Sequence, residues 1–287
     1  MFFIEPTTDL WVQTGAWESH VARCARICYK SEKDDLDLTK AIIMCDNLWS
    51  RNHRSMFRHG TTYFFVPDSS VLPQWIWGVL INSPYVFHAQ NESRLWISTN
   101  EQYLNENPVI GELLLEYKVS QDTYIEEAAK DCYPALEGLR LTMVVITQIS
   151  TSRELNRTSP NNIAEQSTRY VNFGKKGGIA ICKPHWYDGA KWWQRALYRG
   201  YCKVSEWTYN ILLRAGFKPE DARGVLPLDT ATKVAYTYTI KEWKHILDLR
   251  LFETTGKAHP NAKKSAQQIH DLIKEFNKNF IVYGAIF

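Results

Sequence analysis

The chain has 287 residues, of which 45% are hydrophobic and 13% aromatic, so it can bury one large core or two modest ones. Lys and Arg exceed Asp and Glu by 34 − 31 = 3, an excess too small for a protein whose main partner is a nucleic-acid backbone. No stretch approaches the ~20 apolar residues of a membrane span and the N-terminus lacks a signal-peptide pattern, so we expect a cytoplasmic protein without membrane contact.

The first third of the chain predicts two helices followed by strands. Apolar residues at three-and-four spacing predict a helix over residues 19–29, and a second helix is expected over 38–49. The β-branched and aromatic run at 61–66 predicts a strand that Pro67 ends. Residues 83–99 are typical of a hairpin, because polar turn formers around Gln90 separate two apolar runs.

The middle and last thirds alternate between helix and strand patterns. We expect a helix over 108–132, a buried strand over 139–149 and a loop at 175–178. A long helix over 188–215 should end at Gly216, and we interpret its Trp and Tyr residues as core. The remaining predicted elements are a short helix at 219–226, a strand at 232–240, and helices at 241–252 and 261–280.

The order of these elements predicts a single α+β domain over residues 1–287, because no repeat, low-complexity tract or linker divides the pattern. The chain also has six cysteines without C-x-x-C spacing, which we expect to be reduced thiols. They stand at positions 24, 28, 45, 132, 182 and 202.

The stretch 152–173, SRELNRTSPNNIAEQSTRYVNF, gathers arginines and acceptors with few apolar residues between them. Arg153 and Arg157 would share a face if a helical turn follows the preceding strand and ends at Pro160. Glu165, Ser167 and Arg169 alternate at period two, so an extended segment would point all three the same way. Because arginine makes paired hydrogen bonds to phosphate or carboxylate, these segments could converge on an anion. A solvated loop with ordinary ion pairs remains the alternative on spacing alone.

Other signatures of chemistry are weak. His53 and His59 are six apart, which matches no zinc pattern, so we expect no metal site. The sequence has neither a G-x-S-x-G motif nor a glycine-rich phosphate loop, although a Ser-His-Asp or Cys-His nucleophile stays open. Any nucleotide bound here would therefore be held by side chains.

Residues 221–250, DARGVLPLDTATKVAYTYTIKEWKHILDLR, resemble the C-terminal signature of the flavin-dependent thymidylate synthases. The signature contains Ala-Arg-x-x-Leu-Pro, a Thr in the next strand and a helix ending in Leu-Arg, which match Ala222 to Pro227, Thr232 and Arg250; Ala258 to Pro260 resemble its Ala-His-Pro element. The stretches ARICY at 25–29, HRSMFRHGTTYFF at 53–65 and EQSTRYVNF at 165–173 resemble other family motifs in the same order. Residues 68–140 match least and are predicted to be an insertion.

The resemblance implies a fold and a reaction. The fold would be a central, largely antiparallel sheet with flanking helices. The reaction would transfer a one-carbon unit from methylene-tetrahydrofolate to carbon five of deoxyuridine monophosphate, with FAD as cofactor and NADPH as the reductant. The family also implies a homotetramer in which Arg223 reaches the nucleotide from a neighbouring subunit. No protein nucleophile is needed, so Cys28 would serve packing.

The resemblance also assigns roles to individual side chains. The nucleotide would be bound by Glu154, Arg157, Glu165, Ser167, Arg169, Tyr170, Arg223 and Arg250, of which Ser167 and Arg250 would be catalytic. Flavin would be bound by His53, Ser55, Arg58, Arg157, Thr158, Ser159, Thr239, Lys241, His245 and His259.

Several departures from the family pattern fall on the flavin side. Thr158 and Ser159 replace a histidine and an arginine, Arg58 stands where Glu is usual, and Thr239 and Lys241 replace an Asn and an Arg. We therefore expect weaker flavin binding, with Arg58 or Arg153 supplying lost donors. Two alternatives stay open, namely a hydroxymethylase of deoxyuridylate or deoxycytidylate, and a nucleotide-binding relic without flavin chemistry.

Overall fold

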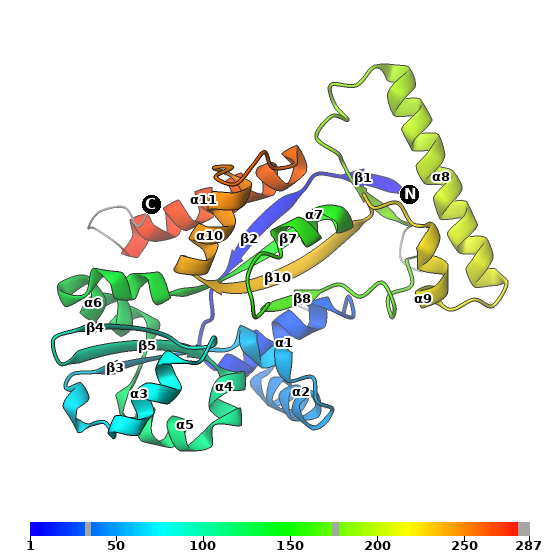
Figure 1. The fold of residues 1–287 in the computed structure, drawn as a ribbon. Helices are drawn as coiled ribbons and strands as arrows, with labels where there is room; N and C mark the ends of the chain where they lie inside the picture. Colours follow the sequence, from blue (N-terminus) through cyan, green and yellow to red (C-terminus); the bar gives the residue numbers. More distant parts are fainter. Residues whose placement is uncertain (32–35, 174–177, 281–287) are drawn as a thin grey trace.

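The computed structural model describes residues 1–31, 36–173 and 178–280, and two four-stranded antiparallel sheets dominate it (Figure 1). The first sheet has, in spatial order, β2 (Thr7–Trp11), β7 (Arg140–Gln148), β10 (Ala231–Thr239) and β8 (Ile163–Glu165). β7 and β10 pair along their whole lengths, from Gln148 opposite Ala231 to Arg140 opposite Thr239. Both are rich in β-branched and aromatic residues that suit a buried sheet, and both predicted strands are confirmed.

The second sheet has the order β4 (Phe87–Asn91), β5 (Arg94–Asn100), β3 (Thr61–Val66) and β6 (Lys118–Val119). The predicted hairpin is confirmed as β4 and β5, which turn at Glu92 with a positive φ of 50°. Three strands of this sheet, β4, β5 and β6, come from residues 68–140. The segment predicted as an insertion thus builds most of a sheet of its own.

Helices cover both faces of the first sheet. On one face, α6 (Gln121–Asp131), α10 (Ile240–Arg250) and α11 (Pro260–Phe280) pack against β7 and β10 in the largest hydrophobic cluster. On the other face, α1 (Trp17–Ile27) brings Cys24 and Ile27 against Val144 and Ala235, and α2 (Leu38–Ser50) packs on α1. Tyr63 and Trp96 of the second sheet also belong to the largest cluster, and the single domain stays a prediction.

The remaining helical elements are short, except for α8. They are α3 (Gln74–Ile81), α4 (Glu101–Glu106), α5 (Pro108–Leu114), α7 (Ile149–Leu155), α8 (Trp192–Arg214), α9 (Pro219–Ala222), and the 3-10 helices η1 (Arg54–His59), η2 (Ser69–Val71), η3 (Leu115–Tyr117), η4 (Tyr133–Gly138) and η5 (Arg223–Val225). Gly216 follows α8 with a φ of 94°, which confirms the predicted end of that helix. The predicted helices at 19–29, 38–49, 219–226, 241–252 and 261–280 are also confirmed, within a few residues at their ends.

The continuous helix predicted over 108–132 is wrong. The segment forms α5, η3, β6 and α6, because Lys118 and Val119 pair with Phe64 and Tyr63 at the edge of the second sheet. Ser120 then caps α6 by accepting the Thr123 N–H. Strand pairing has overridden a pattern that favoured helix.

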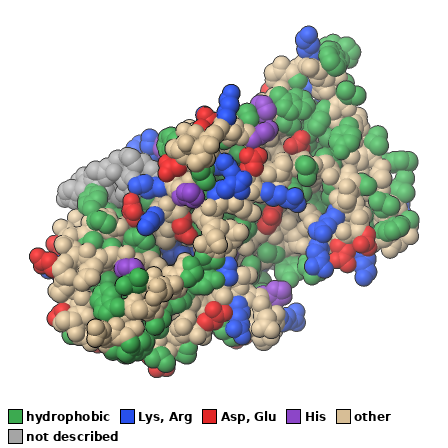
Figure 2. All heavy atoms as spheres, viewed as in Figure 1, with side chains coloured by type: hydrophobic (Ala, Val, Ile, Leu, Met, Phe, Trp, Pro, Cys, Tyr) green, Lys and Arg blue, Asp and Glu red, His purple; other side chains and the backbone are tan. Residues whose placement is uncertain are grey.

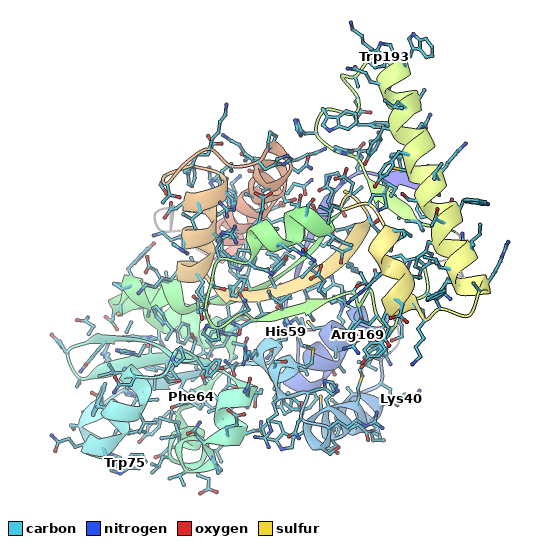
Figure 3. All side chains as sticks on the ribbon, turned by 45° about the vertical axis from the view of Figure 1, so that its right-hand side comes forward. Lys40, His59, Phe64, Trp75, Arg169 and Trp193 are labelled. Atoms are coloured by element: carbon cyan, nitrogen blue, oxygen red, sulfur yellow. The ribbon has the colours of Figure 1, made fainter. Side chains whose placement is uncertain are left out.

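The interpretation of the α8 aromatics as core is also wrong for most of them. Cys202, Ser205 and Tyr209 are buried against the rest of the chain, whereas Trp192 is 76% exposed and Trp207 is 65% exposed. The reason is geometric, because α8 projects from the body and rests on little more than α9, η5 and the hydrophobic cluster around the two-stranded sheet of β1 (Phe2–Ile4) and β9 (Ala180–Cys182) (Figure 1). Figure 2 shows hydrophobic side chains along its outer side, and Figure 3 shows Trp193 at its free end.

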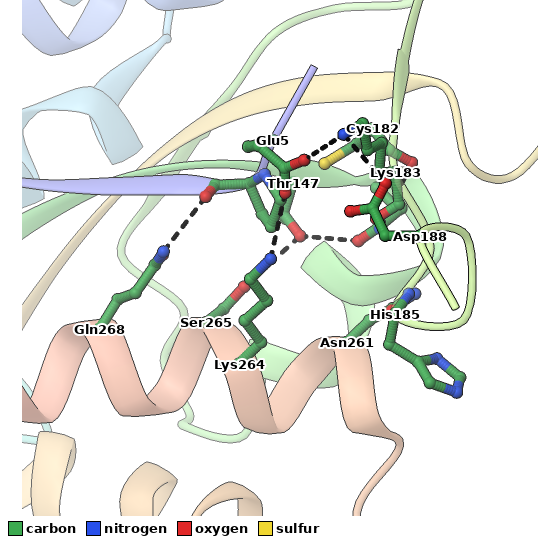
Figure 4. A network of polar contacts seen from close by, with 12 residues as sticks. Glu5, Thr147, Cys182, Lys183, His185, Asp188, Asn261, Lys264, Ser265 and Gln268 are labelled. Carbon is green, nitrogen blue, oxygen red and sulfur yellow. Dashed lines mark hydrogen bonds and ion pairs between the residues drawn. The ribbon is translucent and has the colours of Figure 1, made fainter. Parts of the chain in front are cut away.

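A polar network fixes the first turns of α11 to the segments that follow β1 and β9 (Figure 4). The Glu5 carboxylate pairs with Lys183 at 2.6 Å and Lys264 at 3.1 Å, and Lys183 also pairs with Asp188. The hydrogen bond from Lys183 holds the pKa of Glu5 below its ordinary value. Asn261 accepts the His185 N–H at 2.8 Å, so α11 is anchored by side chains as well as by its apolar face.

Three other observations bear on the sequence predictions. All six cysteines are free thiols, as expected. Within residues 1–31, 36–173 and 178–280, no helix is long and apolar enough to cross a membrane. The loop predicted at 175–178 lies, apart from Gly178, outside the described residues.

Candidate functional site

The loop after β8 carries the predicted nucleotide-binding residues Ser167, Arg169 and Tyr170. The Ser167 hydroxyl oxygen accepts the N–H groups of Arg169 at 3.1 Å and Tyr170 at 3.3 Å, and the Ser167 N–H donates to the Cys28 carbonyl. The expected extended alternation from Glu165 to Arg169 is therefore wrong beyond Glu165, where β8 ends. A serine that binds the next backbone amides turns the chain instead of extending it.

Glu165 connects three elements of the fold. Its Oε1 atom accepts hydrogen bonds from the Ser152 hydroxyl of α7 at 2.9 Å and from the Thr232 hydroxyl of β10 at 3.1 Å. Both hydroxyls are buried, and Glu165 is the acceptor for Thr232 and, beside the Ile149 carbonyl at 3.0 Å, a second acceptor for Ser152. Glu165 thereby joins the 152–173 stretch to the threonine of the C-terminal signature.

Two arginine contacts join this loop to the segment at 220–223. Arg223 Nη1 donates to the Thr168 hydroxyl at 2.7 Å, and Arg169 Nε donates to Glu220 Oε2 at 3.1 Å. The Glu220 hydrogen bond raises the pKa of Arg169, whose side chain is 55% exposed. Arg169 is thus a surface ion-pair partner in the free chain, and no neighbouring subunit is needed to bring Arg223 to Thr168.

The sequence interpretation missed Thr168 and Glu220. Thr168 stands between two predicted ligands, and Glu220 stands three residues before Arg223 in the first turn of α9. An acidic residue just ahead of the Ala-Arg pair was the available signal for the ion pair with Arg169. Tyr170, the remaining predicted ligand of this loop, is exposed, with its ring 5.8 Å from that of Tyr29.

A second group of predicted ligands lies at the end of α7. Arg250 Nε donates to the Glu154 carbonyl at 2.7 Å. Burial and the positive charge of Arg157 lower the pKa of Arg250, against the opposing effect of Glu154. The structure therefore brings Glu154, Arg157 and Arg250 together, and Ser152 one turn earlier links α7 to Glu165.

The predicted helical turn exists but ends earlier than expected. α7 stops at Leu155, not at Pro160, so Arg157 lies beyond the helix. Its Nη1 donates to the carbonyls of Arg153 and Asn156, which are among the acceptors that a helix C-terminus leaves open. Arg153 and Arg157 consequently do not share a helix face.

Two predicted flavin ligands are engaged inside the chain. Arg58 Nε donates to Gln102 Oε1 at 2.7 Å and its Nη1 donates to the Asn161 carbonyl at 2.8 Å. Thr239 caps α10, since its hydroxyl accepts the Glu242 N–H and donates to the Glu242 carboxylate. Arg58 therefore ties η1 to the loop at 157–162, and Thr239 starts a helix.

Most of the other predicted flavin ligands are exposed. His53, Ser55, Ser159, Lys241 and His245 present their side chains to solvent on η1, the 157–162 loop and α10. The chain reaches His53 through Asn52, which has a φ of 60° at the end of α2, a conformation that asparagine tolerates.

Thr158 and His259 differ from that exposed set. Thr158 Oγ1 is buried beside the Tyr238 hydroxyl, close enough for its polar contact to lower the pKa of Tyr238 against the larger effect of burial. His259 contacts a different part of the molecule, where its ring packs edge-on against His185 with centroids 5.4 Å apart and its Nδ1 accepts the Asn261 N–H. The described contacts of His259 thus lead to α11 rather than to the other predicted flavin ligands.

A buried polar chain that the sequence did not reveal lies behind η1. His20 Nε2, Thr142 Oγ1, Thr237 Oγ1 and His59 Nδ1 follow one another at 2.9, 2.7 and 2.7 Å. Burial lowers the pKa of His20 to about 4 and that of His59 to about 3, so both rings are neutral at pH 7. This series of hydrogen bonds holds η1 on β7 and β10, at the boundary between the two sheets where Figure 3 labels His59.

The predicted residues therefore form two connected groups and one outlier. The nucleotide group joins the 165–170 loop to η5 and, through Glu165, to α7. The flavin group comprises ligands on η1, the 157–162 loop and α10, of which Arg58 joins the first two. A cavity of about 350 Å³ borders the nucleotide group at Gln166 and Thr232. Among the described residues no group of three or more His, Cys, Asp or Glu side chains is placed to hold a metal ion.

Comparisons with known proteins place the chain in a family. A family model described as thymidylate synthase complementing protein matches residues 115–277, more than half of the chain. The probable flavin-dependent thymidylate synthase of Paramecium bursaria Chlorella virus 1 is 34% identical over 89 residues, which make up 31% of this chain and 40% of that relative. The match thus spans less than half the length of the viral protein.

Two solved structures of the UMP/dUMP methylase PolB from Streptomyces cacaoi also resemble the chain. The complex with 5-Br dUMP has a TM-score of 0.45 at 18% identity, covering 96% of this chain and 93% of its own. The complex with 5-Br UMP has a TM-score of 0.43 at 17% identity, covering 95% and 91%. Because the family model spans more than half of the sequence, the chain belongs to the flavin-dependent thymidylate synthase family.

Proposed function

We propose that this chain binds deoxyuridine monophosphate and transfers a one-carbon unit from methylene-tetrahydrofolate to its carbon five, with FAD as cofactor and NADPH as reductant. One observation carries the proposal. Glu165 binds Ser152 and Thr232, while Arg223 binds Thr168, so the two motif segments meet in one chain. Family membership explains why those segments should meet at a nucleotide.

The nucleotide phosphate would lie between Arg169 and Arg223. Both guanidinium groups are exposed at the 165–170 loop, and a phosphate dianion gives stronger, charge-assisted hydrogen bonds than the Thr168 hydroxyl does. Arg169 would exchange the Glu220 carboxylate for the phosphate, which costs little because exposed ion pairs contribute little. Ser167 and Glu165 would orient the sugar and base, and Tyr170 would close the exposed side.

The described residues fit a flavin, although fewer side chains are free than the sequence suggested. Arg157, Lys241, His245 and Arg250 place basic side chains at the end of α7 and on α10, which suits a pyrophosphate. When bound, the flavin supplies hydride and carries the one-carbon unit. The chain's own residues orient the nucleotide, and the positive charges of Arg157 and Arg250 would stabilise negative charge that develops on the uracil ring.

The state of Cys28 supports a reaction without a cysteine nucleophile. Cys28 lies beside the 165–170 loop, where its carbonyl accepts the Ser167 N–H. Burial raises the pKa of its thiol to about 11, and the charge of Glu165 adds to that effect. Because the thiolate is the nucleophilic form, a thiol that stays protonated at pH 7 is poorly suited to attack the pyrimidine.

A second candidate is a nucleotide-binding protein without flavin chemistry. The engagement of Arg58 with Gln102 and Asn161, and of Thr239 with Glu242, favours it, because two expected flavin ligands are used elsewhere. The nucleotide group is the same under both candidates. They therefore differ in one property, which is flavin binding.

A product assay separates the candidates. Purified protein is incubated with FAD, NADPH, methylene-tetrahydrofolate and either deoxyuridylate or deoxycytidylate, and the nucleotide mass is measured. A methyl product from deoxyuridylate is expected, and a hydroxymethyl product would replace the proposed reaction by a related one. An unchanged nucleotide, together with nucleotide binding and colourless protein after flavin addition, would support the binding-only candidate.

We further propose that the chain assembles as a homotetramer and that one of its interfaces pairs α8 with α8 of a second copy. Six residues recur at spacings of four and three along its outer face, and all of them are exposed, namely Trp193, Leu197, Gly200, Val204, Trp207 and Ile211. This heptad seam suits a second helix of the same kind, and Gly200 permits close approach of the two backbones. A cavity of about 650 Å³ lined by Trp193, Leu197 and Tyr201 extends the seam toward the loop that precedes α8.

Sedimentation of two single variants tests this assembly. Val204→Asp places a charge in the seam and should lower the oligomeric order, whereas Lys203→Asp makes the same substitution at a neighbouring exposed position outside it. Equal sedimentation of both variants and the wild type would remove α8 from the interface, and an active wild-type monomer would refute the tetramer.

A further inference from the structure

A cavity of about 750 Å³ separates the two sheets at a place that none of the predicted ligands lines. Its walls come from the segment 12–17 before α1, from β3, from the start of β7, and from β6 with the first turn of α6. The volume falls in the range of about 300–1,000 Å³ that is typical of small-molecule sites. β6 and α6 belong to residues 68–140, so the cavity exists only where that segment meets the first sheet.

Arg140 gives the cavity a buried positive charge. Its exposed fraction is 7%, and no carboxylate lies within 4 Å of it in the described parts of the chain. Nε donates to the Thr61 hydroxyl at 3.3 Å and Nη2 donates to the Arg58 carbonyl at 2.8 Å. Nη1 donates to no described residue and is not sealed from solvent, which leaves two N–H bonds available. The Glu242 carboxylate acts on the guanidinium only from beyond 4 Å and is itself bonded to Thr239. Burial of the Arg140 charge is costly, and a bound anion in direct contact would offset that cost.

The other lining groups suit an anion that carries a ring. Lys118 adds a second cation at the rim, on the edge strand β6. Trp17 provides half-buried aromatic surface, and Tyr63, whose ring is largely buried against Tyr124, accepts the backbone N–H of Arg140 at 3.0 Å. Asp122 is the opposing charge in the lining, so two cations face one carboxylate.

We propose that this cavity binds a small organic anion, a planar ring that bears a phosphate or a carboxylate. The anionic group meets Arg140 Nη1 and Lys118, and the ring lies along Trp17 and Tyr63. This site is separate from the proposed nucleotide and flavin groups, and it does not depend on the proposed reaction. It gives the 68–140 segment a binding role in addition to its structural one.

Calorimetric titration with three probes tests the proposal on the full chain. Phenyl phosphate and benzoate share a planar ring and differ in the anion, and benzyl alcohol is the neutral control. We expect one of the two anions, or both, to bind, and benzyl alcohol to bind at least about tenfold more weakly, the factor that 1.4 kcal/mol supplies. Failure of both anions to bind, or equal binding of the neutral probe, overturns the proposal.

Three variants locate the bound probe. Lys118→Glu changes an exposed side chain and leaves the fold intact, so it should weaken anion binding at least about tenfold, while Lys40→Glu on α2 should leave it unchanged. Arg169→Ala alters the proposed nucleotide group and should also leave probe binding unchanged. Binding that survives Lys118→Glu but is lost with Arg169→Ala would assign the probe to the nucleotide group and refute the cavity site. If the protein forms no thymidylate but still binds the probe, the proposed function fails and the cavity site is retained.

Discussion

The nucleotide group and the flavin group use charged side chains in opposite ways. In the nucleotide group, Arg169 and Arg223 extend from the loop and η5 into solvent and make contacts that a ligand can replace. In the flavin group, Arg58 and Thr239 turn inward and hold a loop and a helix start. The polar side chains of the family motifs are therefore exposed in one group and serve as framework in the other.

The largest expected effect is the loss of folding stability in acid, which depends on the two buried histidines behind η1. The folded pKa values of His59 and His20, about 3 and about 4, lie below the ordinary 6.5, so the unfolded chain binds more protons between these values and pH 6.5. The contribution of the two neutral rings to stability is then fully present above pH 6.5 and is lost as the pH drops toward 3. We expect a loss of about 4 kcal/mol between pH 7.5 and 5, measured by urea unfolding.

A histidine substitution sharpens this comparison. Changing His245, which is exposed on α10, to Gln should leave the acid loss unchanged. Changing His59 to Gln lowers stability at pH 7.5 but should flatten the pH dependence by about half. An acid loss that is equal in wild type and His59→Gln would contradict a neutral buried ring.

The next effect concerns Glu165, which links the 165–170 loop to α7 and β10 within the nucleotide group. Glu165→Ala removes the acceptor of the buried Thr232 hydroxyl, whereas the Ser152 hydroxyl keeps the Ile149 carbonyl, and should lower the unfolding free energy by about 1–2 kcal/mol. Deoxyuridylate binding should fall with it, because α7 and the loop lose their common partner. Glu220→Ala removes an exposed carboxylate and is the matched control, so equal destabilisation by both variants would show that Glu165 is not a structural link.

Arg58→Ala and Arg169→Ala form a contrasting pair. Arg58→Ala loses hydrogen bonds to Gln102 and Asn161 and should destabilise the fold by about 1–2 kcal/mol, with nucleotide affinity kept. Arg169→Ala should leave the denaturation midpoint unchanged and weaken nucleotide binding. Both properties can be measured on the same preparations by urea titration and calorimetry, and an exchange of the two outcomes would invert the assignment of the groups.

The smallest effect is expected at Lys241. Its side chain is exposed on α10, so Lys241→Ala should change stability by less than about 0.5 kcal/mol. Flavin affinity should fall about threefold if this cation faces the pyrophosphate, as the quenching of flavin fluorescence would report. Unchanged flavin affinity would leave Arg157, His245 and Arg250 as the basic residues of that surface.

The sequence predicted most elements because their patterns were local. β7 and β10 were recognisable from β-branched runs, and the motif order indicated the family before any geometry was known. The failures depended on partners distant in the chain. The pairing of Val119 with Tyr63 divided a predicted helix, and the projection of α8 left Trp207 exposed instead of buried.

The candidate site shows the same contrast between local patterns and contacts with residues distant in the chain. The resemblance selected Glu165 and Arg223 as ligands, but only the structure shows that Glu165 binds Ser152 and that Arg223 reaches Thr168 in its own chain. The inward turn of Arg58 could not be predicted, because its partner Asn161 lies 103 residues away and spacing says nothing about such a contact. Local patterns thus identify candidate ligands, and tertiary contacts decide which partner each side chain binds.

Titration of deoxyuridine monophosphate into the wild type, Arg169→Ala and Arg214→Ala tests the central claim most directly. Arg214 is an exposed arginine in the last turn of α8 and serves as the matched control. The account predicts that the wild type and Arg214→Ala bind the nucleotide alike, and that Arg169→Ala binds it at least about tenfold more weakly because a phosphate contact is lost. Equal affinity of all three proteins would show that the 165–170 loop does not hold the phosphate.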